Sequence, residues 1–154
     1  MIKIKPLITN LAISLGVGIA SALITKNSME LYENINKPAL SPPSVTFPIV
    51  WTILFILMGI SSYLVYISKS TDKKDALKIY AFQLFANFVW PILFFNNQLY
   101  LFSFIWLIVL LLLVLTMIIA FFKISKPAGL LQVPYILWIT FASYLNIMVY
   151  ILNR

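Results

Sequence analysis

Five long stretches of apolar residues, separated by short polar segments, dominate the sequence. They cover residues 7–25, 44–67, 76–95, 99–122 and 128–152, and each is 19 to 25 residues long. A helix of about 20 apolar residues crosses the ~30 Å hydrocarbon layer of a bilayer. The alternation of apolar and polar residues that membrane strands require is missing. The pattern therefore predicts an all-α fold, a single domain of residues 1–154 that forms an integral membrane bundle of five transmembrane helices.

The connection between the first two stretches, residues 26–43, is the only long one. It carries Glu30 and Glu33, which are half of the acidic residues. A long loop on a compact scaffold is usually functional or disordered, and we interpret this one as a lid. The first stretch has an alternative interpretation, because two lysines before an apolar run that ends in the small residues 20–22 also resemble a cleavable signal peptide.

Composition excludes a soluble protein, because 62% of the residues are hydrophobic and only 10% are charged, against about a quarter in soluble chains. Too few polar side chains remain to cover an aqueous surface. The net charge of +7 does not indicate nucleic-acid binding. The basic residues lie in the tails and connections or, for Lys78, at the start of a stretch, as membrane insertion requires.

The distribution of these basic residues predicts the orientation of the chain. Five spans place the termini on opposite sides of the membrane. The side of the N-terminus holds eight of the eleven: Lys3, Lys5, Lys69, Lys73, Lys74, Lys78, Lys123 and Lys126. The other side holds Lys26, Lys37 and Arg154. The excess predicts a multi-pass protein of the cell membrane with its N-terminus in the cytoplasm and its C-terminus outside.

Cysteine and histidine are both absent, so disulfides, thiolate chemistry and the commonest metal ligands are excluded. The spans contain no acid–base pair, which argues against hydrolysis or group transfer by conventional proton-transfer catalysis. We therefore predict no metal site and no required cofactor.

Aromatic and amide side chains gather in the outer half of the predicted bundle. Asn87, Trp90 and Phe94 share one face of the third helix, and Trp51 and Phe55 share one face of the second. The last helix carries a stripe of Trp138, Phe141, Ala142 and Leu145. A packed core shows similar stripes, and an interfacial belt accounts for Trp106 and for Trp90 as well. Several tryptophans with a buried amide and a small residue favour a ligand pocket.

The two amides within the spans, Asn87 and Asn146, have two interpretations. An amide in hydrocarbon is costly without a partner. It either bonds to another helix as structural glue or faces a ligand.

Proline and small residues add two features. Pro91 and Pro134 lie inside spans, where each removes a backbone hydrogen bond and favours a kink. Kinked helices can open a cavity between them. Two rows of small residues on the first helix predict close packing against another helix or, alternatively, a dimer contact: Ala12, Gly16 and Ala20, and Ser14, Gly18 and Ala22.

These residues resemble the TspO or translocator-protein family, also called tryptophan-rich sensory proteins or peripheral-type benzodiazepine receptors, and in particular a bacterial member. Three motifs in the family's order carry the resemblance over nearly the whole chain: Tyr32, Ile35, Lys37-Pro38, Pro42-Pro43, Phe47, Val50-Trp51, Met58-Gly59 and Tyr63; Asn87, Trp90 and Phe94-Phe95; and Pro134-Tyr135, Trp138, Phe141-Ala142 and Leu145-Asn146. The sequence departs from the family at Leu40, where a Trp is usual, and at Phe55, where a Tyr is common.

The resemblance implies a homodimer that binds porphyrins and, in animals, cholesterol, isoquinoline carboxamides and benzodiazepines. It implies a pocket closed by the first loop and lined by Tyr32, Pro42, Trp51, Phe55, Asn87, Trp90, Trp138, Ala142 and Leu145. A loose sterol motif can be traced as Leu145, Tyr150 and Arg154.

Four functions follow from the resemblance and the residues together. The first is a membrane receptor that binds porphyrin by stacking, with light-dependent oxidative breakdown in which Trp51 and Trp138 are redox-active neighbours as its one enzymatic possibility. The second is binding that signals stress without turnover. The third, transport, is disfavoured because the sequence reveals no inner counterpart of the outer pocket and no inverted repeat. The fourth is a small assembly factor without a ligand.

Overall fold

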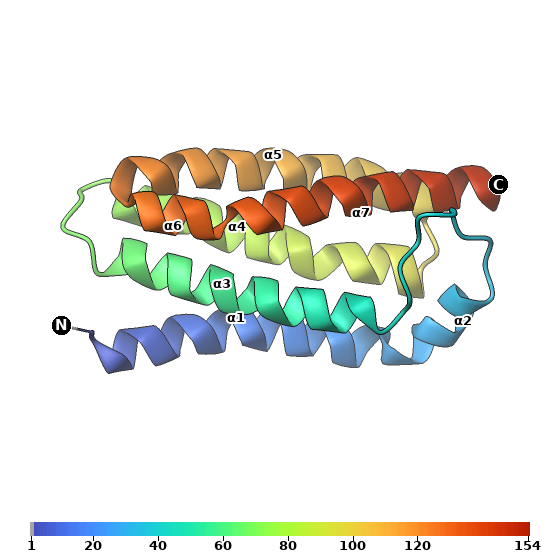
Figure 1. The fold of residues 1–154 in the computed structure, drawn as a ribbon, viewed down its shortest axis with the longest axis horizontal. Helices are drawn as coiled ribbons and strands as arrows, with labels where there is room; N and C mark the ends of the chain where they lie inside the picture. The colour runs from blue at the N-terminus through green and yellow to red at the C-terminus, as the bar shows by residue number, and fades with distance from the viewer. Residues whose placement is uncertain (1) are drawn as a thin grey trace.

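A computed structural model describes residues 2–154 as a helical chain without strands (Figure 1). Its elements in order are α1 (Ile4–Thr25), the 3₁₀ turn η1 (Lys26–Ser28), α2 (Met29–Glu33), α3 (Thr46–Tyr66), α4 (Lys73–Pro91), the π-helical turn η2 (Ile92–Asn96), α5 (Tyr100–Ile124), α6 (Lys126–Leu131) and α7 (Val133–Leu152).

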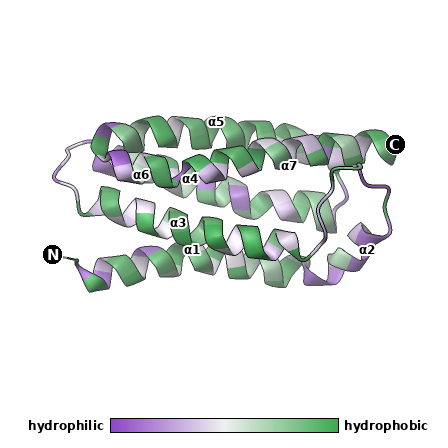
Figure 2. Cartoon of the chain, viewed as in Figure 1, coloured by the Kyte–Doolittle hydropathy of each residue, from purple (hydrophilic) through white to green (hydrophobic). Residues whose placement is uncertain are grey.

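Among residues 2–154, five helical rods are long and apolar enough to cross a membrane: residues 4–33, 46–66, 73–96, 100–124 and 126–152. Apolar residues cover most of their length, and polar residues collect toward the ends (Figure 2). The all-α membrane bundle predicted from the hydrophobic pattern is thereby confirmed. The termini lie at opposite ends of the bundle (Figure 1), as an odd number of spans requires.

We name the two ends by what they carry. The basic end holds the N-terminus, residues 67–72 and the turn at Ser125, and the loop end holds α2, residues 34–45 and the C-terminus (Figure 1). Which end faces the cytoplasm stays a prediction.

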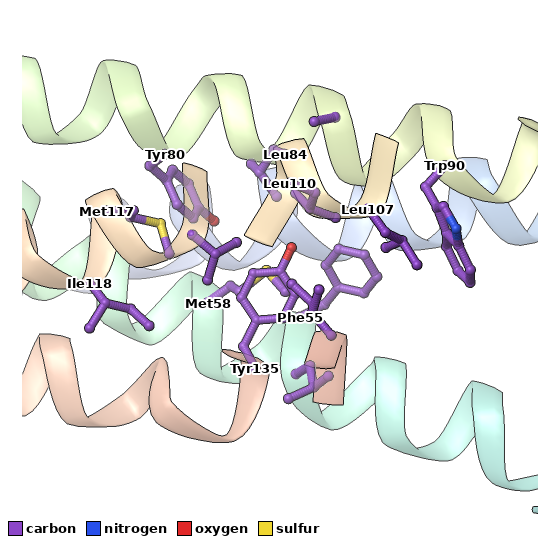
Figure 3. Close-up of a cluster of buried hydrophobic side chains, with 14 of the residues drawn as sticks. Phe55, Met58, Tyr80, Leu84, Trp90, Leu107, Leu110, Met117, Ile118 and Tyr135 are labelled. Carbon is purple, nitrogen blue, oxygen red and sulfur yellow. The ribbon is translucent and has the colours of Figure 1, made fainter. Parts of the chain in front are cut away.

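The helices form a ring in which α1 lies beside α3 and α4, while α5 lies beside α4 and α7. The short helix α6 packs against both α3 and α5 at the basic end. Side chains from α3, α4, α5 and α7 fill the centre, as Figure 3 shows for Met58, Leu110 and Tyr135, each at most 1% exposed. This core fixes the four helices, while the outward faces present apolar side chains to lipid.

Two of the rods are not uniform α-helices, and each is interrupted next to a proline. The third rod changes from α to π geometry directly after Pro91, where the Asn97 N–H bonds to the Ile92 carbonyl five residues back at 3.1 Å. The last rod, predicted as one helix over 128–152, is divided at Gln132 into α6 and α7, with Pro134 in the first turn of α7. A proline has no N–H to continue the preceding turn, so the rod breaks just before it.

The first loop also differs from the prediction. It contains η1 and α2, and α3 begins at Thr46 rather than at residue 44. The Thr46 N–H bonds to the Pro43 carbonyl at 2.9 Å, so the second of the two prolines begins a turn that leads into the helix.

The two rows of small residues on α1 have different environments. In the second row, Ser14 is fully buried and Gly18 packs against the Phe55 ring. A Cβ on Gly59 of α3 would lie 2.9 Å from the Leu11 Cα, so α1 and α3 approach closely at that level. In the first row, Gly16 has no atom within 4 Å of where its Cβ would be. The predicted packing is therefore confirmed for Ser14 and Gly18 of the second row, while Ala22 of that row is exposed, as are Ala12 and Gly16 of the first.

Candidate ligand pocket

A cavity of about 310 Å³ lies near the loop end between α1, α3, α4 and η2. This volume is at the lower end of the ~300–1,000 Å³ typical of small-molecule sites. Its lining comes from all four elements and from η1 and α2: Gly18, Ser21, Ala22, Thr25, Lys26, Met29, Phe47, Pro48, Trp51, Phe55, Asn87, Trp90, Pro91 and Phe95.

Four of the predicted ligand-binding residues line this cavity: Trp51, Phe55, Asn87 and Trp90. The Trp51 ring lies 5.7 Å from that of Phe55 and 6.3 Å from that of Trp90, centroid to centroid, in tilted geometry. Aromatic faces at this spacing make favourable contacts with one another. They form a wall against which a flat aromatic molecule can stack.

Tyr32 of α2 lies above the cavity at the loop end, where it is 6% exposed. Its ring packs edge-on against Phe47 and Phe95 at 6.1 and 5.3 Å, and the Lys37 Nζ lies 4.9 Å over its face. Hydrogen bonds of the loop backbone to Asn153 tie the loop to the end of α7: the Asn36 N–H donates to Asn153 Oδ1 at 3.0 Å, and Asn153 Nδ2 donates to the Asn36 carbonyl at 2.8 Å. Tyr32 and its loop therefore form a tethered cover over the cavity. Pro42 lies in this loop and is half-buried, but it is not part of the cavity lining.

The amide of Asn87 combines both interpretations given for it. Its Nδ2 donates to the Tyr135 hydroxyl at 2.7 Å, and that hydroxyl donates to Gln83 Oε1 at 2.8 Å. These bonds join α4 to α7 inside the bundle. The Asn87 side chain also lines the cavity, so it holds two helices together and offers a polar group to a ligand.

Asn146, by contrast, has its polar atoms engaged by neighbouring helices. Its Oδ1 accepts from Trp90 Nε1 and from Ser103 Oγ, each at 3.0 Å, and its Nδ2 donates to the Tyr100 carbonyl at 2.7 Å. It acts as structural glue between α4, α5 and α7, and it also fixes the plane of the Trp90 ring in the cavity wall. Trp106 similarly donates to the Ala86 carbonyl at 2.8 Å.

The three predicted site residues of α7 lie outside the cavity lining. Ala142 and Leu145 are buried, at 4% and 5% exposure. The Trp138 ring packs against Phe47 at 5.9 Å, and it lines a separate open groove between α3 and α7. The structure brings Trp51 and Trp90 together but sets Trp138 on the other side of α3.

Sequence reasoning missed the contribution of α1. Gly18, Ser21, Ala22 and Thr25 form one wall of the cavity. The Ser21 Oγ is buried and has no hydrogen-bond partner within residues 2–154. The four-residue repeat of small residues was the available signal, because small side chains leave room for a ligand as well as for another helix.

A second cavity, of about 480 Å³, lies between α1 and α4 toward the basic end. The expectation that the outer pocket has no inner counterpart was therefore wrong. Spacing within one helix cannot reveal a gap between two helices.

Comparison with known proteins agrees with these features. Residues 10–152 match the sequence profile described as the TspO/MBR family. The chain is 37% identical to the tryptophan-rich protein TspO of Chlorobaculum tepidum over 93% of this chain and 92% of the relative. It is 34% identical to the protein of the same name from Archaeoglobus fulgidus, over 98% and 99%. It is also 33% identical to the human translocator protein, over 88% and 82%.

Proposed function

Because this chain belongs to the TspO/MBR family and holds an aromatic pocket inside a membrane bundle, we propose that it is a membrane receptor for porphyrins. Isoquinoline carboxamide or benzodiazepine-type drugs are proposed to occupy the same pocket. The observation that carries the proposal is the wall of Trp51, Phe55 and Trp90 beside the Asn87 amide.

The chemistry of the wall and mouth suits a flat molecule with an acidic edge. The aromatic rings supply stacking surfaces. Lys26 lines the cavity at its loop-end mouth and is exposed, so its ammonium is available to a porphyrin carboxylate. Ser21 also lines the α1 wall of the cavity, with its Oγ buried.

Porphyrin titration tests this proposal. Protoporphyrin IX should quench the tryptophan fluorescence of the purified protein saturably. An isoquinoline carboxamide should compete with the porphyrin for the pocket. Metal-free porphyrin should bind more tightly than haem, because the chain has no His or Cys to ligate iron. Haem binding that is far tighter than metal-free porphyrin binding would contradict recognition by stacking.

Light-dependent oxidative breakdown of bound porphyrin is the enzymatic part of the proposal. Dioxygen is the oxidant: excited porphyrin passes energy to it, and the reactive oxygen formed adds to the macrocycle. Trp51 and Trp138 are the tryptophans proposed as redox-active neighbours. Only Trp51 is in the cavity lining, so the two should contribute unequally.

Illumination of Trp51→Phe and Trp138→Phe distinguishes their roles. We expect Trp51→Phe to lower the yield of porphyrin breakdown several fold at saturating porphyrin, and Trp138→Phe to lower it less. Absorbance of the porphyrin band and mass spectrometry of the products measure the yield. Equal product from both variants and wild type would remove Trp51 and Trp138 from the mechanism, whereas tight binding without any product in light would indicate a binding or sensory role.

Transport of porphyrin or other hydrophobic molecules is the second candidate function. It is favoured by the two cavities that lie between the same pair of helices, α1 and α4, toward opposite ends, since a transporter must expose its ligand on both sides of the membrane. Flux of porphyrin into sealed vesicles measures transport.

The family resemblance also leads us to propose that the protein is a homodimer.

A further inference from the structure

The cavity near the basic end is the starting point of a separate proposal. It is formed mainly by facing stretches of α1 and α4, with Tyr66 from the end of α3. Its apolar lining is Pro6, Ile13, Leu77, Ala81 and Leu84, and its polar lining is Lys5, Thr9, Asn10, Tyr66 and Tyr80. The mixture is that of a site for an amphipathic molecule rather than for a purely apolar one.

The cavity is reached from the lipid-facing surface. Ile13 on the α1 side is 50% exposed, and Ala81 on the α4 side is also exposed. Only 11% of the most apolar window of the first rod is buried, so most of α1 faces outward. A hydrocarbon chain in the surrounding bilayer can therefore enter between α1 and α4 without crossing the protein.

Tyr80 contributes its ring to the lining of the cavity. Its hydroxyl is buried beside the side chains of Ser14 and Ser62, so it is turned into the protein and away from the cavity. The α4 wall therefore offers mainly apolar surface, which suits a hydrocarbon chain.

The charge at the mouth of the cavity selects the head group. Lys5 lines the cavity, is exposed, and makes none of the ion pairs found in the described part of the chain. Eight of the eleven basic residues lie toward this end. A juxtamembrane lysine attracts anionic lipid by about 1 kcal/mol.

We propose that this cavity binds one anionic phospholipid. Its hydrocarbon chain lies between α1 and α4, and its phosphate meets Lys5. The site is separate from the aromatic pocket and does not depend on porphyrin binding.

Native mass spectrometry tests the proposal. The full chain is reconstituted in nanodiscs of equal phosphatidylglycerol and phosphatidylcholine with the same acyl chains, then released in mild detergent. Wild type should retain one lipid with a preference for phosphatidylglycerol. Lys5→Gln should reduce that preference about fivefold, which corresponds to one lysine, and Lys3→Gln, a neighbouring exposed lysine outside the lining, should not.

Filling the cavity should remove the lipid altogether. Ala81→Phe from the α4 side and Thr9→Phe from the α1 side should each reduce retained lipid more than tenfold, because both positions are exposed and line the cavity. Ala12→Phe, an exposed position of α1 outside the lining, is the matched control. Wild-type retention in both filled variants, or equal retention of the two lipids by wild type, would overturn the proposal. Soluble glycerol phosphate should not compete, since it lacks the chains.

Discussion

Replacing Gly18 by leucine is expected to weaken porphyrin binding by more than tenfold. A Cβ at this position would lie 2.6 Å from Cδ2 of the Phe55 ring, closer than Cβ atoms approach other atoms. The leucine side chain and the displaced ring would both enter the cavity that Gly18 and Phe55 line. Overpacking of this kind costs roughly 1–3 kcal/mol, and here a bound ligand would have to compete for the same space. Titration of protoporphyrin IX against tryptophan fluorescence measures the change.

Gly16→Leu is the matched control for this variant. It makes the same substitution two residues away, where no atom lies within 4 Å of the added Cβ. Its porphyrin affinity should equal that of wild type within a factor of two. Equal affinity of all three proteins would mean that porphyrin binds elsewhere, and loss of binding in both variants would point to a role of α1 other than lining the cavity.

Replacing Gly59 by leucine should produce the largest loss of stability among these substitutions. A Cβ on Gly59 would lie 2.7 Å from the Ser14 Oγ and 2.9 Å from the Leu11 Cα. Because one of these atoms belongs to the backbone of α1, a rotamer change cannot relieve the contact and the two helices must separate. The cost is roughly 3 kcal/mol, which lowers the Tm of a chain of this size by about 5–10 °C. Thermal unfolding in detergent, followed by circular dichroism, gives the value.

Gly16→Leu again serves as the control, since it adds the same bulk to α1 on the outward side. It should melt within about 2 °C of wild type. A Gly59→Leu protein that melts with the wild type would show that α1 and α3 do not need their close approach.

Much of the site could be predicted because its residues share faces of single helices. Trp51 with Phe55, and Asn87 with Trp90, occur at helical spacing, and both pairs line one cavity. The α7 residues also follow helical spacing, but that spacing does not say which neighbour they face. Trp138 faces Phe47 and a groove beside α3, so it lies away from the wall formed by Trp90.

The fold itself was determined by the sequence, because each span is an independent consequence of local composition. Backbone hydrogen bonds must be satisfied within the helix when lipid is the solvent, so an apolar run of about 20 residues specifies a spanning helix without reference to its neighbours. The same locality accounts for the disturbances at Pro91 and Pro134.

Only the tertiary structure decided which helices enclose space. The wall supplied by Gly18 and Ser21 and the second cavity between α1 and α4 both depend on how far apart two helices stand. That distance is set by pairs of side chains remote in the sequence, such as Gly59 against Leu11 and Gly18 against Phe55. Hydropathy cannot predict this distance, because an apolar side chain is accommodated equally well by lipid and by a neighbouring helix.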